Sequence, residues 1–255
     1  MMMNFTLSNQ VQIPAVGIGT FMMTPDQAEQ AVVAALACGS RMIDTAQAYM
    51  NERAVGRGIK RSGVAREDIF ISTKIWASQY LTEGTVEKSL ELLGTDYIDL
   101  MFIHQPAGDF MAGYRKLETV AIRPMVNQIE MHPYFAQESA LKVMEEYQIV
   151  PEAWAPLGGG RHNPFDNEMV KEIAAAHGKT VGQVVLRWNV QRGVVVIPKS
   201  VHKARIEENF QIWDFTLTEE EMQKISSLDL GYQGTAVKHF DPEFVKMCNI
   251  RKIHE

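Results

Sequence analysis

Short apolar stretches alternate along this chain with longer stretches in which apolar residues recur every three or four positions. The short stretches predict β-strands and the longer ones predict amphipathic helices. The clearest strand is Tyr97 to Ile103, which is nearly continuous in apolar residues, as expected of a strand buried on both faces. Alternation of this kind predicts a parallel sheet whose strands are joined through right-handed helical crossovers.

The predicted elements cover most of the chain. A small hairpin is expected at residues 5–7 and 11–13, and single strands at 15–19, 42–44, 68–74, 97–103, 124–129, 149–153 and 193–197. Helices are expected at 24–38, 52–61, 83–93, 110–118, 137–147, 167–177, 180–191, 203–210 and 218–228, followed by an irregular tail. The first helix has the best-marked ends, since Thr24 and Gln27 form a capping box around Pro25 and Gly39 stops the helix.

One interval between predicted strands is too short. Only about twenty residues separate the strand that ends before His104 from the strand that begins at Pro124, whereas a further strand and helix need roughly 30. Seven consecutive parallel strands are counted, and a (β/α)₈ barrel has eight. We predict such an α/β barrel with an N-terminal β-hairpin and one β/α unit missing near residues 118–123, through a deletion or through a stretch absent from the printed sequence. The alternative is an open, doubly wound sheet of seven strands.

The composition fits one globular domain. A length of 255 residues suits a single barrel over residues 1–255, and no linker divides the chain. The net charge of −6 disfavours a nucleic-acid or anionic membrane partner. The chain has no apolar run of membrane-spanning length and no secretion signal, and its two cysteines lack metal-binding spacing. We therefore expect a cytoplasmic protein, a monomer or weak oligomer, that acts on a small molecule.

Polar residues follow several predicted strands, which is where parallel barrels place their active sites. Asp44, Lys74 and His104 each stand at or directly after a strand, and Tyr49 lies five residues beyond Asp44. Each of them alone has a simpler explanation. Asp44 could cap a helix, Lys74 could be a solvated strand end, and His104 and Tyr49 could be packing residues.

Together these four side chains make a plausible proton donor for a carbonyl group. A tyrosine hydroxyl has a pKa of about 10, and a neighbouring lysine ammonium favours the phenolate and lowers that pKa. An aspartate paired with the lysine keeps it charged and oriented, and a histidine can bind the carbonyl oxygen. The sequence contains neither a metal-ligand cluster nor a GxSxG motif, so hydrolysis has little support.

A carbonyl reduction also needs a hydride source, and the last part of the chain suggests one. Lys199 and Ser200 follow the last predicted strand, and Arg205 and Asn209 lie on the next helix, where barrels often bind phosphate. The glycines at 158–160 could let the backbone approach a pyrophosphate, although they could equally form a flexible loop. The sequence has no G-x-G-x-x-G, so the Rossmann mode of dinucleotide binding is not supported.

Motifs across nearly the whole chain resemble those of the aldo-keto reductase family. The matching stretches are Ile13–Thr20, Gly39–Glu52, Ile71–Trp76, Tyr97–His104, Val126–Glu130, Ile197–Ser200 and Arg205–Phe210. Within the family, the chain is similar to prokaryotic-type members such as diketogluconic acid reductases and to prostaglandin F synthase-like members. The motifs occur in the family's order, which is more specific than any one of them alone.

The resemblance implies a (β/α)₈ barrel that reduces aldehydes or ketones with NADPH bound across its carboxyl end. It implies Tyr49 as the general acid, Lys74 and Asp44 as the residues that tune it, and His104 as the residue that orients the carbonyl. Gln128 would bind the nicotinamide carboxamide, Trp154 would stack on the ring, and Asn209 would bind the adenine. The implied cofactor contacts in full are Gly19, Thr20, Asp44, Gln128, Trp154, Leu157, Lys199, Ser200, Arg205 and Asn209, with Lys199, Ser200 and Arg205 on the 2′-phosphate. The implied substrate-pocket residues are Trp76 and Gln105.

The chain departs from the family where the β/α unit is missing. The family has a strand with a Gly-x-Ser-Asn turn between the positions of Glu118 and Pro124, and the Ser-Asn pair helps to hold the carboxamide. Two alternatives to an NADP⁺-type alcohol dehydrogenase stay open. One is a Schiff-base aldolase or isomerase with Lys74 as nucleophile. The other is a non-catalytic nicotinamide-binding or structural protein on the same barrel.

Overall fold

The computed structural model describes residues 3–118, 125–160, 162–231, 241–251 and 253. They form two compact units, each described by itself below. The four-stranded unit comprises Ile18–Arg123, Val201–Lys203 and Val237–Glu255, and the three-stranded unit comprises Met1–Gly17, Pro124–Ser200 and Ala204–Ala236. The single domain expected over residues 1–255 stays a prediction.

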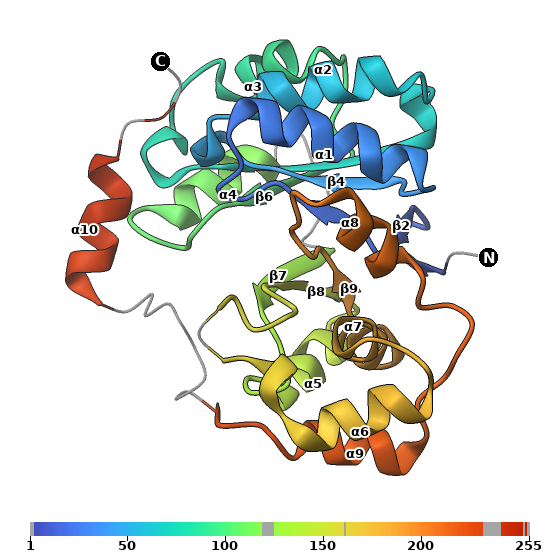
Figure 1. Cartoon of the computed structure of the whole chain (residues 1–255). Helices are drawn as coiled ribbons and strands as arrows, with labels where there is room; N and C mark the ends of the chain where they lie inside the picture. Colours follow the sequence, from blue (N-terminus) through green and yellow to red (C-terminus); the bar gives the residue numbers. More distant parts are fainter. Residues whose placement is uncertain (1–2, 119–124, 161, 232–240, 252, 254–255) are drawn as a thin grey trace. The chain divides into compact units, whose positions relative to one another are not determined.

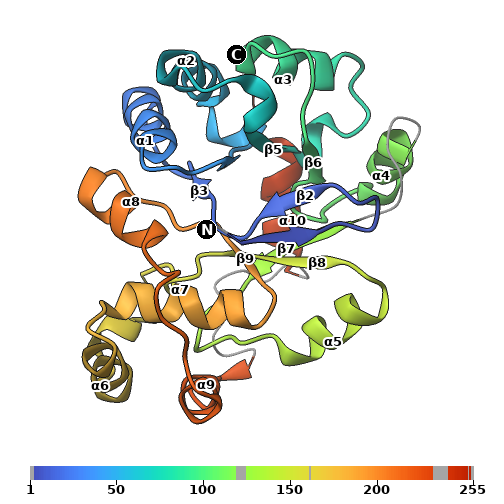
Figure 2. The same ribbon diagram turned by 90° about the vertical axis from the view of Figure 1, so that its right-hand side faces the viewer.

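The four-stranded unit contains a parallel sheet with its strands in chain order. The strands are β3 (Ile18–Gly19), β4 (Met42–Asp44), β5 (Phe70–Ile75) and β6 (Leu100–Ile103). The helices are α1 (Pro25–Ala37), α2 (Glu52–Ser62), α3 (Thr85–Leu93) and α4 (Phe110–Glu118), and short 3₁₀ turns are η1 (Gln47–Tyr49), η2 (Arg66–Asp68) and η3 (Ala77–Gln79). Figures 1 and 2 show α1, α2 and α3 packed side by side along the sheet. All six residues of β5 are buried, so this strand is the centre of the unit.

The helix ends predicted from the sequence are confirmed where capping residues mark them. Thr24 and Gln27 form the reciprocal capping box at the start of α1, and Gly94 ends α3 in a left-handed conformation. Helices α2 and α3 approach so closely that a Cβ on Gly56 would collide with the carbonyl oxygen of Leu93. A glycine is therefore required at this crossing.

The three-stranded unit contains a hairpin and a second parallel sheet. The hairpin is formed by β1 (Asn4–Thr6) and β2 (Gln12–Pro14), and the parallel sheet by β7 (Val126–Glu130), β8 (Val150–Trp154) and β9 (Val195–Val196) in that order. Its helices are α5 (Glu138–Glu146), α6 (Glu168–Ala176), α7 (Val181–Gln191), α8 (Lys203–Phe210) and α9 (Glu219–Ser226), with the 3₁₀ turn η4 (Pro164–Asp166) before α6. Trp188 on α7 is completely buried among apolar residues of this unit. Figure 1 shows α6, α7 and α9 grouped below the sheet.

Strand β6 corrects one prediction from the sequence. The apolar stretch Tyr97 to Ile103 was expected to be buried on both faces, but the strand covers only Leu100–Ile103 and all four residues are half-buried. Among the described residues, β6 pairs only with β5 and is the edge of its sheet. A strand with the apolar sequence typical of the middle of a sheet is thus only half-buried.

The described residues contain seven parallel strands, four in one sheet and three in the other. This number agrees with the count made from the sequence and is one fewer than a (β/α)₈ barrel has. The interval between β6 and β7 is where a β/α unit was predicted to be missing. Residues 119–124, on which that prediction falls, lie outside the described residues.

The tail that was expected to be irregular contains a helix, α10 (Pro242–Ile250). Asp241 caps its first turn by accepting a hydrogen bond from the Glu243 amide, and Pro242 occupies the first turn. This start signal is present in the sequence, so the prediction of an irregular tail was wrong there. The helix buries Cys248 in the four-stranded unit.

Candidate active site

Lys74 and Asp44 form a buried ion pair at the carboxyl ends of β5 and β4. The Lys74 Nζ atom lies 2.7 Å from Asp44 Oδ1, 2.6 Å from Asp44 Oδ2 and 2.7 Å from the carbonyl oxygen of Thr45. Ser72 also donates a hydrogen bond to Asp44 Oδ1, at 2.9 Å. Both charged side chains are about 98% buried, so the pair is shielded from water. The predicted partnership of Lys74 with Asp44 is thus present in the structure.

Tyr49 and His104 complete the predicted set in the same unit. Tyr49 ends η1, and the Lys74 Nζ atom lies 5.0 Å from the centre of its ring. The ring of His104 meets the ring of Tyr49 edge-on, with 5.6 Å between the centres. The four residues proposed from the sequence are therefore neighbours, because parallel strands bring the segments that follow them to one edge of the sheet.

His104 is held as a neutral imidazole. Burial lowers the pKa of His104 well below its usual value, and the positive charges of Lys74 and Arg251 lower it further. The backbone amide of His104 donates to the carbonyl oxygen of Ile75 at 2.9 Å, which fixes the residue beyond the end of β6. A neutral imidazole keeps one N–H donor, and that donor can bind a carbonyl oxygen.

The expected substrate-pocket residues flank His104. The Trp76 ring stands edge-on to the His104 ring at 4.9 Å between centres and is 3% exposed. Gln105 follows His104 with a positive φ of 56°. The Tyr80 hydroxyl donates to the carbonyl oxygens of His104 and Gln105, at 2.7 and 2.6 Å. Burial raises the pKa of Tyr80, so this donor stays protonated and keeps the turn in place.

Two buried amides that the sequence reasoning left without a role hold the loop around Tyr49. Gln47 donates to the backbone and hydroxyl oxygens of Thr85 and accepts from the Trp76 amide at 3.1 Å. Asn51 donates to the carbonyl oxygens of Thr20 and Met23. Both lie in the stretch Gly39–Glu52 that carried the family resemblance, which was the available signal. Their side chains fix the two ends of η1.

A buried carboxyl group lies behind the ion pair. Glu52 is 2% exposed and accepts a hydrogen bond from the Thr73 hydroxyl at 2.7 Å. Burial raises the pKa of Glu52, although the hydrogen bonds from Thr73 and Ser89 and the charge of Lys74 oppose the rise. The positive charge of Lys74 therefore favours the ionised form of Glu52, while burial favours the neutral form.

Two predicted cofactor contacts lie in the four-stranded unit beside Asp44. Gly19 pairs with Asp44 in the register of β3 and β4. The amide and hydroxyl of Thr20 both donate to the Asp44 carbonyl oxygen, at 3.0 and 3.1 Å. Both residues are buried, so they support the backbone of Asp44.

Other predicted cofactor contacts lie in the three-stranded unit. Gln128 on β7 donates through Nε2 to Oε1 of Glu152 on β8, at 2.7 Å, and Glu152 is completely buried. Trp154 ends β8 with its side chain half-buried, and Leu157 is half-buried in the following loop. Gly158 has a φ of 87°, and a Cβ there would collide with the carbonyl oxygen of His162, so this loop position requires glycine.

The residues expected at the phosphate lie near the start of α8, and Asn209, expected at the adenine, lies in its last turn. Lys199 and Arg205 are exposed, while Ser200 and Asn209 are 8% and 6% exposed. Two exposed cations next to a helix N-terminus suit a phosphate group.

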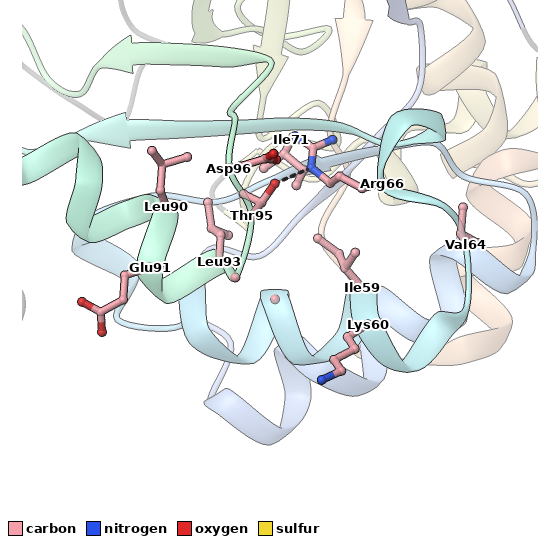
Figure 3. A pocket seen from close by; sticks show the side chains of 12 residues that line it. Ile59, Lys60, Val64, Arg66, Ile71, Leu90, Glu91, Leu93, Thr95 and Asp96 are labelled. Carbon is pink, nitrogen blue, oxygen red and sulfur yellow. Dashed lines mark hydrogen bonds between the residues drawn. The ribbon is translucent and has the colours of Figure 1, made fainter.

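A separate hollow of about 720 Å³ lies at the opposite end of β5 (Figure 3). It is open to solvent and lies between α2 and α3. Its half-buried cation, Arg66, is already bound to Thr95 and Asp99, at 2.9 and 2.7 Å. This hollow is therefore not the site of the chemistry described above.

No group of three or more His, Cys, Asp or Glu within the described ranges is arranged to hold a metal ion. None of the helices in those ranges is long and apolar enough to cross a membrane. The parallel strands, with the four predicted site residues near their carboxyl ends, define an α/β protein.

Comparison with known proteins identifies the family. A sequence model described as "Aldo/keto reductase family" matches residues 15–120 and 111–230. The chain is 42% identical to 9,11-endoperoxide prostaglandin H2 reductase of Trypanosoma cruzi, over 88% of this chain and 90% of that protein. It is 41% identical to glyoxal reductase of Bacillus subtilis, over 88% of this chain and 91% of that protein. The crystal structure of an aldo/keto reductase from Brucella melitensis matches with a TM-score of 0.84 at 38% identity, over 90% of this chain and 100% of that chain.

The chain therefore belongs to the aldo/keto reductase family, whose members are oxidoreductases that reduce aldehydes and ketones with a nicotinamide dinucleotide. The family assigns the chain to the (β/α)₈ barrel class and not to a doubly wound sheet. The fold class and the type of reaction predicted from the sequence are thus confirmed.

The same comparisons indicate that this chain lacks a segment that its relatives have. The alignment with the Trypanosoma cruzi reductase runs over 257 positions but covers 88% of the 255 residues, which is about 224. About 33 aligned positions therefore have no residue here, which is the length of one β/α unit. The family match is also divided into two pieces that overlap at residues 111–120. Both observations support a missing unit near residues 118–123.

Proposed function

We propose that this protein is an NADPH-dependent reductase of aldehydes or ketones, of the NADP⁺-type alcohol dehydrogenase class, with Tyr49 as its proton donor. The observation that carries the proposal is the position of the Lys74 ammonium, which lies 5.0 Å from the Tyr49 ring centre and is held there by Asp44. A positive charge at this position stabilises the phenolate that remains after the proton has left. His104, as a neutral donor, binds the carbonyl oxygen and directs it to the Tyr49 hydroxyl.

The residues in the three-stranded unit fit a nicotinamide dinucleotide. Because Gln128 already donates its Nε2 proton to Glu152, the orientation of its amide is fixed for binding a carboxamide. Trp154 offers a half-exposed aromatic face, and Lys199 and Arg205 offer two exposed cations for a 2′-phosphate, which favours NADPH over NADH. NADPH supplies the hydride when it is bound. Leu157, Ser200 and Asn209 are proposed as further contacts.

The decisive experiment removes only the Tyr49 hydroxyl. We expect Tyr49→Phe to lower kcat for an aromatic aldehyde or a small dicarbonyl about a hundred-fold or more, measured as loss of NADPH absorbance. Tyr147→Phe is the matched control, because Tyr147 is 60% exposed just after the end of α5 and should keep full activity. NADPH binding, followed by fluorescence, should be unchanged in both variants. Unchanged turnover in Tyr49→Phe would show that another group donates the proton.

The structure disfavours Lys74 as a Schiff-base nucleophile. A lysine amine must lose its proton before it attacks a carbonyl, but Lys74 donates to three oxygens, two of them from a carboxylate. Borohydride should therefore trap no lysine adduct in the absence of nicotinamide. A non-catalytic role would require tight NADPH binding without turnover across a broad panel of carbonyl compounds, and the assembled proton-donating set makes that role the weaker candidate.

We further propose a cytoplasmic monomer or weak oligomer that acts on a small carbonyl compound and binds neither nucleic acid nor membranes. The cysteine chemistry supports the compartment, because Cys38 and Cys248 are thiols and not half-cystines. The negative net charge of −6 supports the absence of a polyanionic partner.

A further inference from the structure

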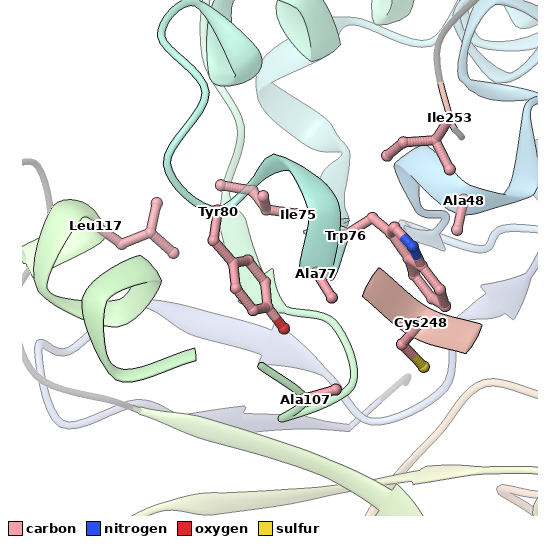
Figure 4. Packing of buried hydrophobic residues seen from close by; sticks show 9 residues of the cluster. All are labelled: Ala48, Ile75, Trp76, Ala77, Tyr80, Ala107, Leu117, Cys248 and Ile253. Atoms are coloured by element: carbon pink, nitrogen blue, oxygen red, sulfur yellow. The ribbon is translucent and has the colours of Figure 1, made fainter. Parts of the chain in front are cut away.

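The C-terminal helix α10 packs against the substrate side of the proposed active site. Figure 4 shows Cys248 of α10 beside Trp76, with Ala48 and Ile253 close to the same ring. Cys248 is completely buried in this cluster, so the end of α10 is anchored next to the ring that touches His104. The residue that ends the helix, Arg251, is thereby brought to the site.

Arg251 is held in place by its backbone and by its side chain. Its amide donates to the carbonyl oxygen of Met247, and its own carbonyl oxygen accepts from the Ser78 hydroxyl at 3.2 Å. The guanidinium donates to the carbonyl oxygen of Ala48 at 3.0 Å and lies 5.3 Å from the centre of the Trp76 ring. Although the residue is exposed, these contacts fix the position of its cationic group.

Among the described residues, the charges around Arg251 do not compensate its positive charge. The charge of Lys74 is matched by Asp44, and His104 is neutral. Among the described residues, no carboxylate lies within ion-pair distance of Arg251. The exposed residue Asp109 caps α4 by accepting from the Ala112 amide, and Lys246 on α10 adds a further exposed cation.

We propose that Arg251 binds an anionic group of the substrate, so that this reductase prefers aldehydes or ketones that carry a carboxylate. A carbonyl group between Tyr49 and His104 lies beside Trp76. The Arg251 guanidinium lies 5.3 Å from the centre of the same Trp76 ring and binds the carbonyl oxygen of Ala48, the residue before Tyr49. A carboxylate a few bonds away from the carbonyl carbon therefore reaches the guanidinium. Its planar set of donors suits a carboxylate better than a single ammonium would. This inference rests on the proposed function.

The test compares two substrates of nearly equal shape, 4-carboxybenzaldehyde and its neutral amide, 4-carbamoylbenzaldehyde. We expect the wild-type protein to favour the carboxylate about ten-fold or more in kcat/KM, mainly through KM, because the anion is bound before and during the reaction. The preference should fall as ionic strength rises, since Arg251 is exposed. Arg251→Gln should lower kcat/KM for the carboxylate about ten-fold more than for the amide. Lys246→Gln removes the same charge from the same helix and should keep the ratio of the wild type.

A binding measurement separates this inference from the proposed function. Quenching of tryptophan fluorescence by 4-nitrobenzoate and by 4-nitrobenzamide reports their binding without any turnover, and comparison with Arg251→Gln shows whether that binding depends on Arg251. If no carbonyl compound is reduced but nitrobenzoate binds more tightly than the amide only when Arg251 is present, the proposed function fails and the anion site stands. If the wild type does not distinguish the two substrates, or if Arg251→Gln keeps the preference, the anion site is overturned. The wild-type ratio and its salt dependence decide the matter even if Arg251→Gln does not fold.

Discussion

The ammonium of Lys74 contacts both carboxylate oxygens of Asp44, at 2.7 and 2.6 Å, across two neighbouring strands of one sheet. With both side chains about 98% buried, neither charge is solvated by water. The pair is therefore a structural as well as a chemical feature, because each charge is tolerated in the interior only in the presence of the other.

Removing one member of this pair should destabilise the protein more than removing both. We expect Asp44→Asn and Lys74→Met each to lower the free energy of unfolding by about 3–5 kcal/mol, since each leaves an unpaired buried charge. The double variant should lose less than either single variant, because it leaves no unpaired buried charge. Urea unfolding of the four proteins gives the coupling energy. Additive losses would show that the two charges are compensated by other groups.

The protonation of His104 predicts how stability depends on pH. The folded protein keeps this imidazole neutral, because burial, Lys74 and Arg251 lower its pKa. The unfolded chain takes up a proton below about pH 6.5, so unfolding becomes easier as the pH falls through that value. The contribution approaches about 1.4 kcal/mol for each pH unit below it. His104→Gln should remove this slope.

The measurement is urea unfolding of the wild type and His104→Gln at pH 7.5 and pH 5. For each protein, the change in the free energy of unfolding between pH 7.5 and pH 5 is compared. The absolute values are not compared, because the substitution also removes ring contacts with Tyr49 and Trp76 at every pH. Equal pH dependence in the two proteins would show that the pKa of His104 is the same in the folded protein as in the unfolded chain. His202, which is exposed, provides the control substitution His202→Gln.

The sequence predicts the helices and strands well where local signals mark their ends. It predicts them less well where contacts with distant segments determine their length and burial. The strand Met42–Asp44 and the helices Phe110–Glu118 and Lys203–Phe210 have the expected bounds. Strand β6 has fewer residues than its apolar stretch, because burial depends on a neighbouring strand and not on the stretch itself. The four proposed catalytic residues could be found because Asp44, Lys74 and His104 lie at or just after the ends of strands, and Tyr49 lies in the loop that follows Asp44.

The residues that position the catalytic set could not be found from the sequence, because their contacts join segments that are far apart in the chain. Arg251 reaches the carbonyl oxygen of Ala48 across 203 positions of the chain, and Gln47 reaches Thr85 across 38. No local pattern contains such a contact, since it depends on how separate elements pack. The role of Gln128 was implied by the family resemblance, but its partner Glu152 became visible only in the structure.

The missing β/α unit predicts a stability defect in a chain of this sequence. Strand β6 leaves its apolar residues half-buried, and it forms one edge of the described sheet. We expect insertion of the corresponding segment of the Trypanosoma cruzi reductase, about 33 residues after Glu118, to raise the free energy of unfolding by about 2 kcal/mol or more, because those side chains become buried. The urea midpoint and the slope of unfolding measure this. A protein isolated from its source with a mass above 28.7 kDa would instead show that the stretch is absent only from the printed sequence.

The bond between Gln128 and Glu152 predicts a selective change in cofactor affinity. Glu152 is completely buried and holds Nε2 of Gln128 at 2.7 Å, so the Gln128 amide has one orientation. Glu152→Gln replaces one of the two carboxyl oxygens by an NH₂ group, so that the new amide can either accept a hydrogen bond from Gln128 or donate one to it. We expect the Kd for NADPH to rise roughly three- to ten-fold, since the proposed contact with the carboxamide is less well oriented.

The adenosine bisphosphate half of the cofactor provides the control, because it carries the 2′-phosphate but no nicotinamide. Its Kd should be the same for Glu152→Gln and the wild type, since the proposed phosphate contacts at Lys199 and Arg205 are unchanged. Fluorescence titration measures both ligands with the same protein samples. If both ligands bind more weakly, the substitution has disturbed the fold of the unit. If neither does, Gln128 does not depend on Glu152 for its orientation, and the carboxamide is bound by other groups.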